Sequence, residues 1–243
     1  MFDNKDTVVS RARGDIDEGL RAYMLKVYNY MTTGMLMTAF TSYLLLSTGW
    51  IAHFLSFNAA GQATGFNILG WIAILAPLAL VFMISRAASR LNPARAKGLF
   101  FLYAALMGVS LGSIGLAYTG VSMFRAFLIV ACMFLGLSLY GYTTKRDLST
   151  MGRVLFMALI GLIAAVVVNM FVKSGPFDFW ISVAAVVIFS LLTAYDTQAI
   201  RNMYSQGDAS EASDSKAIRG ALALYLDFVN LFVYMLRFVG DRR

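Results

Sequence analysis

The hydrophobic positions of this chain fall into seven long runs that are separated by short polar links. The runs cover Val27–Leu46, Ile68–Ser85, Leu99–Tyr118, Phe124–Tyr142, Val154–Val172, Phe179–Ile200 and Ile218–Val239. Some 20 apolar residues, at a helical rise of about 1.5 Å each, match the hydrocarbon thickness of a bilayer. The pattern therefore predicts an all-α membrane protein with seven transmembrane helices. It divides the chain into an amino-terminal tail (1–26), a transmembrane domain (27–240) and a short carboxy-terminal tail (241–243).

Composition agrees with this class and excludes several others. The chain is 59% hydrophobic and only 14% charged, which excludes an ordinary soluble domain. Its net charge of +7 comes from basic residues scattered among the links, with no basic run interleaved with aromatics, so nucleic-acid binding is not expected. The sequence contains no nucleophile elbow, phosphate-binding loop, dinucleotide fingerprint or zinc motif. We therefore expect neither an enzyme nor a bound cofactor.

The distribution of Lys and Arg predicts the orientation in the membrane. Five lie in the amino-terminal tail, and four, three and three lie in or beside the links after the second, fourth and sixth runs. The other three links hold only Arg125 and Lys173. The amino terminus is therefore predicted to be cytoplasmic. If the last run spans the membrane, Arg237, Arg242 and Arg243 lie outside, against this rule, whereas a re-entrant segment returns them inside. The length of the run favours a full span. The longest polar link, Asn202–Lys216, is predicted to be a mobile loop.

Two acidic residues lie within the last two apolar runs. Asp196 and Asp227 each place a carboxylate where a charge costs at least ~2.5–3.5 kcal/mol. If the sixth helix ends near Tyr204 and the seventh begins at Ile218, the two residues lie ~12 and ~13 Å from the same end. Since consecutive transmembrane helices are antiparallel, the two carboxylates are predicted to share one depth and to make contact.

Such a pair predicts a site for protons and calcium. Two carboxylates in contact away from water cannot easily both be ionised, so a shared proton holds the two helices together. Without that proton the charges repel, and the pair separates or binds a cation. Calcium is a hard cation that takes carboxylate and carbonyl oxygens. Asn230 lies on the same helix face as Asp227 and could add another oxygen.

Other interpretations of these residues stay open. The aspartates could bond to backbone or hydroxyl groups for packing alone. An intramembrane aspartyl protease also needs two helical aspartates, but only Tyr195–Asp196 fits its motifs, because Asp227 follows Tyr-Leu rather than Gly-x-Gly. Arg86, at the end of the second run, could pair with the aspartates. Alternatively, it extends to the lipid headgroups.

Three segments carry a resemblance to a known family. The run Ala223–Gly240 reads ALYLDFVNLFVYMLRFVG, Thr193–Gln198 reads TAYDTQ, and Thr144–Leu148 reads TKRDL. These segments resemble the last helix, the penultimate helix and the link between the fourth and fifth helices of the Bax inhibitor (transmembrane Bax-inhibitor-motif) family. The order of the seven runs matches as well.

The resemblance implies six helices packed around the last one, and a pH-sensitive calcium leak governed by Asp196 and Asp227. It also implies an arginine at the end of the second helix that pairs with the aspartates, with Arg86 or else Arg90 in that role. Some relatives carry an acid within the second helix, whereas Ile68–Ser85 has none. The short loops favour a bacterial inner membrane. An alternative function is a non-transporting regulatory partner of membrane proteases or of cell-death and stress proteins, which would need the tail Met1–Lys26.

Overall fold

The computed structural model describes residues 3–58 and 63–241, with side chains placed for 18–58 and 64–241. Within these residues the chain forms seven helices: α1 Asp3–Ser47, α2 Ile68–Ser89, α3 Pro93–Ala117, α4 Gly120–Thr143, α5 Ser149–Val172, α6 Gly175–Met203 and α7 Ser210–Val239. This confirms the all-α fold with seven helices. The α1–α2 link also holds a 3₁₀ turn, η1 (Trp50–Phe54), and a small hairpin of β1 (Leu55–Phe57) and β2 (Ala63–Phe66), which the hydrophobic pattern did not predict.

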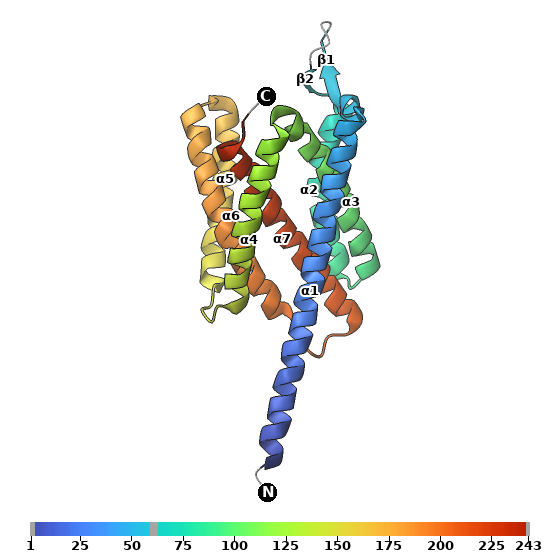
Figure 1. Cartoon of the computed structure of the whole chain (residues 1–243), viewed down its shortest axis with the longest axis vertical. Coiled ribbons are helices and arrows are strands. Elements are labelled where there is room, and N and C mark those ends of the chain that lie inside the picture. The colour runs from blue at the N-terminus through green and yellow to red at the C-terminus, as the bar shows by residue number, and fades with distance from the viewer. Residues whose placement is uncertain (1–2, 59–62, 242–243) are drawn as a thin grey trace.

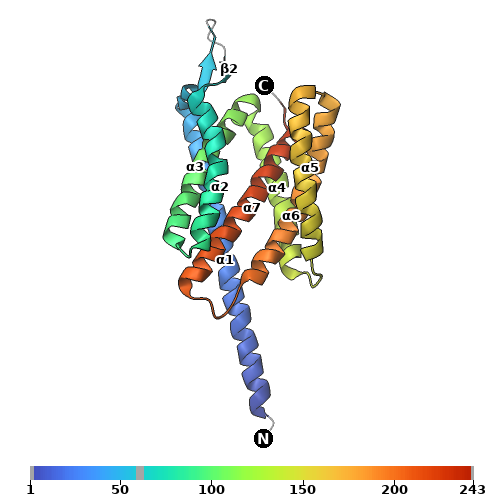
Figure 2. The ribbon, with the colours of Figure 1, turned by 180° about the vertical axis from the view of Figure 1, so that it is seen from behind.

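The last helix lies at the centre of the bundle. In Figures 1 and 2, α7 crosses obliquely between a group formed by α1, α2 and α3 and a group formed by α4, α5 and α6. It packs against α1, α2, α3, α4 and α6. This confirms the expectation that the last helix is central, with α5 packing mainly on α6. Gly152 of α5 lies directly against the Tyr195 ring of α6, which places α5 one layer out.

Six of the described helices, α2 to α7, are long and apolar enough to cross a membrane. α1 is not among them, because its stretch Val27–Leu46 includes several polar residues. That stretch nevertheless packs against α3 and α7, with one face exposed. The helix is continuous across the expected domain boundary at residues 26 and 27, and its first part extends beyond the bundle (Figure 1). Of the two tails, Met1, Phe2, Arg242 and Arg243 lie outside the described residues.

Small residues bring the helices into close contact. A side chain on Gly108 of α3 would place its Cβ 2.6 Å from the carbonyl oxygen of Thr38 in α1. Gly141 of α4 is equally restricted, because the carbonyl of Ala194 in α6 occupies the space of its Cβ. Such small-residue contacts let transmembrane helices approach closely. Gly108 and Gly141 therefore serve packing within the bundle.

The last helix traverses the whole bundle and is not re-entrant. At its far end the Asp241 backbone N–H donates to Ser122 Oγ (2.9 Å) at the start of α4. Arg237 forms an ion pair with Asp178 in the first turn of α6 (2.8 Å). This arginine lies at the end predicted to be outside, where basic residues are disfavoured, and the ion pair gives it a partner there.

The predicted loop Asn202–Lys216 is shorter than expected, because α7 begins at Ser210. Lys216 pairs with Asp208 (2.6 Å), and Asp214 pairs with Lys26 of α1. These two ion pairs fasten the first turns of α7 to the α6–α7 link and to α1.

Candidate functional site

The site is built on the antiparallel contact between α6 and α7. Near one end of this contact Gly220 packs on Ile200, and further along the ring of Tyr234 stacks on Phe189 with centroids 6.2 Å apart. The two helices are thus antiparallel, so residue numbers fall along α6 as they rise along α7. This register places Asp196 opposite Asp227.

The two carboxyl groups meet as predicted. Asp227 is buried, with 4% of its surface exposed, and Asp196 is half-buried. Their side chains lie in hydrogen-bonding contact with each other. An ionised carboxylate only accepts hydrogen bonds, so a hydrogen bond between the two carboxyl groups would need a proton on one of them. The Oδ2 oxygen of Asp227 is buried and accepts no hydrogen bond from an N–H or hydroxyl donor among the described residues.

The predicted contact is present, although the seventh helix begins earlier than the prediction assumed. α6 ends at Met203, close to the assumed Tyr204, but α7 begins at Ser210 rather than Ile218. Asp227 therefore lies 17 residues into its helix. The two levels still coincide because α7 runs obliquely through the bundle (Figure 2).

Both aspartates line a cavity of about 860 Å³ between α5, α6 and α7. Along α5 it extends from Gly152 to Val167, which is ~22 Å at the rise of a helix. Asn230 lines the same cavity, as its predicted position required. Its amide nitrogen donates to the carbonyl of Leu226 (2.9 Å), so its amide oxygen is the atom that could face a cation.

The arginines are arranged differently from the expectation. Arg86 lies in the last turn of α2 and Arg90 caps that helix; both are exposed, and neither lines the cavity. The reason is that α2 packs against α3 and α7, whereas the cavity lies on the side of α5. The basic residue at the cavity is instead Arg153, in the second turn of α5. Its only sequence signal was its position shortly after the TKRDL segment.

At its far end the cavity is bounded by a contact between α6 and α7. Phe189 and Tyr234 line the cavity and stack on each other. Beyond them the Arg237 guanidinium lies over the Tyr234 ring, 5.1 Å from its centroid, and binds Asp178. The two helices are thus held together on this side of the aspartates.

The α4–α5 link is fastened to α6 beside the aspartates. The Gln198 side chain donates to the carbonyl of Arg146 (2.7 Å) and accepts from the backbone N–H of Leu148 (2.8 Å). Within the link, Asp147 accepts from the backbone N–H of Ser149 (2.9 Å), and this hydrogen bond lowers the pKa of Asp147. The segments TKRDL and TAYDTQ therefore form one structural unit next to the pair.

These features define a multi-pass membrane protein with two neighbouring carboxyl groups in its helical core. The profile of the family described as "Inhibitor of apoptosis-promoting Bax1" matches residues 20–243. The chain belongs to the Bax inhibitor family.

Curated relatives agree along their whole length. An uncharacterized protein of Rickettsia prowazekii is 43% identical over 244 residues, covering both chains completely. Inner membrane protein YbhL of Escherichia coli is 43% identical over 227 residues, which cover 93% of this chain and 94% of YbhL. An uncharacterized membrane protein of Streptococcus pyogenes is 38% identical over 224 residues, 92% of this chain and 94% of the relative. These relatives support a bacterial membrane location, and the cytoplasmic amino terminus stays a prediction.

Proposed function

We propose that this protein is a pH-sensitive calcium leak of the membrane, gated by Asp196 and Asp227. One observation carries the proposal: two carboxyl groups meet in the wall of a large cavity, and a buried oxygen of Asp227 accepts no hydrogen bond from an N–H or hydroxyl donor among the described residues. A buried acceptor without a partner costs about 1–3 kcal/mol, so the arrangement calls for a proton or a cation.

The pair acts as a latch between the two helices. With one shared proton, a carboxyl group donates to its carboxylate neighbour and holds α6 against α7. When that proton leaves, two negative charges face each other away from bulk water, and the contact becomes repulsive. A rise in pH therefore opens the latch, and a fall in pH closes it.

Calcium fits the deprotonated pair as a transient ligand. Calcium takes six to eight oxygen ligands when it is tightly held. The described residues contain no group of three or more His, Cys, Asp or Glu side chains that could hold a metal. Asp196, Asp227 and the amide of Asn230 would supply fewer oxygen ligands than a tight calcium site does. Water would complete the coordination shell. Conduction requires binding that is weak enough for the ion to leave.

The experiment is calcium flux into liposomes that contain the purified protein, measured across a range of pH. We expect flux in the wild type to rise with pH. The double variant Asp196→Asn with Asp227→Asn should lose this pH dependence. Asp178→Asn is the matched control, because this acid lies at the far end of α6, outside the cavity. Equal fluxes in the wild type and the double variant at every pH would refute the proposal.

A second candidate is a regulatory partner of membrane proteases or of cell-death and stress proteins, without transport. The observation in its favour is the first part of α1, which extends beyond the bundle as a helix (Figure 1). It predicts co-purification of a specific membrane protein, loss of that protein on deletion of residues 1–17, and no flux above that of empty liposomes.

A further inference from the structure

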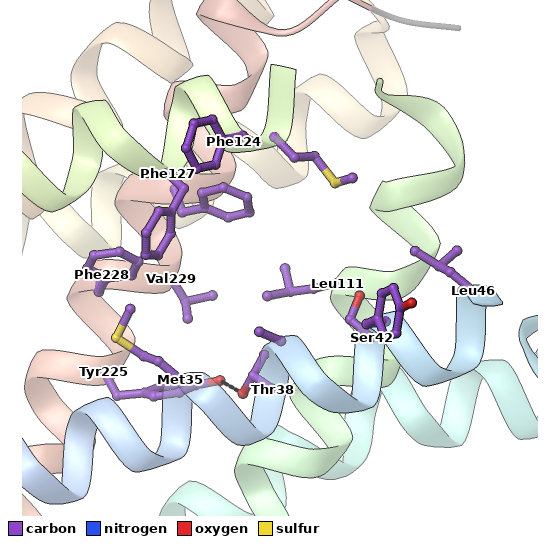
Figure 3. A pocket seen from close by; sticks show the side chains of 14 residues that line it. Met35, Thr38, Ser42, Leu46, Leu111, Phe124, Phe127, Tyr225, Phe228 and Val229 are labelled. Atoms are coloured by element: carbon purple, nitrogen blue, oxygen red, sulfur yellow. Dashed lines mark hydrogen bonds between the residues drawn. The ribbon is translucent and has the colours of Figure 1, made fainter. Parts of the chain in front are cut away.

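A second cleft lies between α1 and α4, away from the aspartates. It consists of two cavities of about 700 and 460 Å³. Both are lined by Met35 and Ala39 of α1, Phe127 of α4 and Phe228 of α7, so they form one continuous groove. We call it the α1–α4 groove. The smaller cavity, which we call the upper cavity, is shown in Figure 3: α1 runs along the bottom of the view, Phe124 and Phe127 lie at the top, and the α7 residues Tyr225, Phe228 and Val229 lie at the left. The larger one is the lower cavity.

The lining of the groove suits hydrocarbon rather than an ion. In the upper cavity the Tyr225 hydroxyl is bonded to Thr38 Oγ1 (2.6 Å), and Thr38 also reaches the carbonyl of Ala104 (2.8 Å). A hydroxyl has one proton, so Tyr225 donates to Thr38 and Thr38 donates to the carbonyl. These polar groups are thus satisfied within the protein, unlike the buried Asp227 oxygen in the other cavity.

The groove is flanked by side chains that face the membrane. Leu36 of α1 is 66% exposed, and Leu135 and Leu139 of α4 are 69% and 63% exposed. All three line the groove. In a bilayer these exposed faces of α1 and α4 contact lipid acyl chains. An acyl chain can therefore enter the groove between them directly from the bilayer.

Polar and basic residues gather at one end of the groove. Arg21 of α1 lines it there, together with Tyr28 and Tyr142. The Tyr28 hydroxyl bonds to Ser138 Oγ (2.5 Å) across the space between α1 and α4. Arg21 precedes the apolar stretch of α1, at the end of the bundle that carries the basic links, and tyrosines favour the membrane–water interface. The charge of Arg21 complements an anionic group at this level.

We propose that the α1–α4 groove binds one phospholipid, with an acyl chain along the groove and its phosphate at Arg21. A guanidinium binds phosphate oxygens through two parallel hydrogen bonds. The lower cavity spans Phe127 to Tyr142 on α4, ~22 Å at the rise of a helix, which exceeds the ~15 Å of one leaflet's hydrocarbon. A whole helix of this length and ~10 Å diameter would occupy roughly 1,700 Å³, more than the groove offers.

The bound lipid would lie close to a chain of hydroxyl groups that reaches α6. Ser138 bonds both to Tyr28 and to Thr197 Oγ1 (3.1 Å), and Thr197 follows Asp196 in the sequence. An acyl chain in the groove would therefore lie beside these hydrogen bonds, which connect α1 through α4 to α6, the helix that carries Asp196.

The test is native mass spectrometry of the full-length protein in mild detergent, after purification from membranes and after addition of a defined phospholipid. We expect one phospholipid per wild-type molecule. Ala39→Phe fills the point where both cavities meet and should abolish the adduct; Arg21→Gln should lower its occupancy several-fold. The matched controls are Ala164→Phe, on the exposed surface of α5, and Arg90→Gln, outside the groove; both should retain the lipid.

A photoreactive phospholipid with a diazirine in its acyl chain provides a second readout that needs no variant. In wild-type liposomes its cross-links should map to residues 24–39 of α1 and 127–142 of α4. If Ala39→Phe fails to fold, Ala131→Phe, which fills the lower cavity, replaces it. Equal lipid retention by all variants, or cross-links spread evenly over the outer helices, would overturn the proposal. A dimer that is lost in Ala39→Phe would overturn it as well, since a second copy would then occupy the groove.

Discussion

Asp227→Asn should remove a pH dependence from the stability of the protein. If the aspartate pair shares a proton in the native state, as proposed, the unfolded chain, with carboxyl groups of ordinary pKa near ~3.9, releases that proton at neutral pH. The native state then binds one proton more than the unfolded state, so the free energy of unfolding falls as pH rises. For one proton the slope is about 1.36 kcal/mol per pH unit. For a chain of this size this corresponds to roughly 3–5 °C in Tm per pH unit.

The asparagine variant keeps the contact without the proton. Its amide can donate to the Asp196 carboxylate at any neutral pH. We therefore expect its Tm to be nearly independent of pH over the range in which the wild-type Tm falls. The assay is thermal unfolding in detergent, followed by the fluorescence of Trp180 in α6 together with the other tryptophans.

Two variants serve as controls for this measurement. Asp178→Asn should retain the wild-type slope, because this acid pairs with Arg237 outside the cavity. His53→Gln removes the single histidine, which is exposed in the α1–α2 link, and should also retain the slope. Parallel Tm curves for the wild type and Asp227→Asn would refute the reasoning that the pair shares a proton.

Three further variants test the packing and polar contacts around the site by thermal unfolding. Gly141→Ala should destabilise the protein by about 1–3 kcal/mol, because its Cβ would collide with the carbonyl of Ala194, whereas Gly136→Ala, with open space at its Cβ, should not destabilise it. Gln198→Leu should cost about 1–3 kcal/mol, because it leaves backbone groups of the α4–α5 link without their partner. Burial raises the pKa of Tyr23 to about 12, so its contribution to stability, complete below pH ~10, is lost as pH rises through about 12. Tyr23→Phe should abolish this alkaline loss, and an unchanged alkaline Tm curve would contradict the assignment.

The contact between the aspartates could be predicted from sequence because it depends on one regular rule. Consecutive helices in a membrane are antiparallel, and a constant rise per residue converts sequence position into depth. An error of eight residues in the start of α7 did not break the inference, because the oblique path of α7 restored the common level of Asp196 and Asp227.

The surroundings of the pair depend on helix packing, which hydrophobic runs do not encode. Whether Arg86 or Arg153 reaches the cavity is decided by which helix covers which face of α7. That choice rests on close contacts such as Gly152 against Tyr195. The extra turns at the start of α7 were missed for a related reason: their polar residues are held by ion pairs to distant segments, as Asp214 is to Lys26.

The central claim is that a shared proton holds α6 against α7 at Asp196 and Asp227. The most direct measurement is the structure of the wild-type protein in lipid at a mildly acidic and at an alkaline pH, compared at the two carboxyl groups. We expect the two groups to be in hydrogen-bonding contact at the acidic pH. At the alkaline pH they should be separated, or bridged by a cation when calcium is present. Carboxyl groups that stay in the same direct contact at both pH values, with no cation between them, would contradict it.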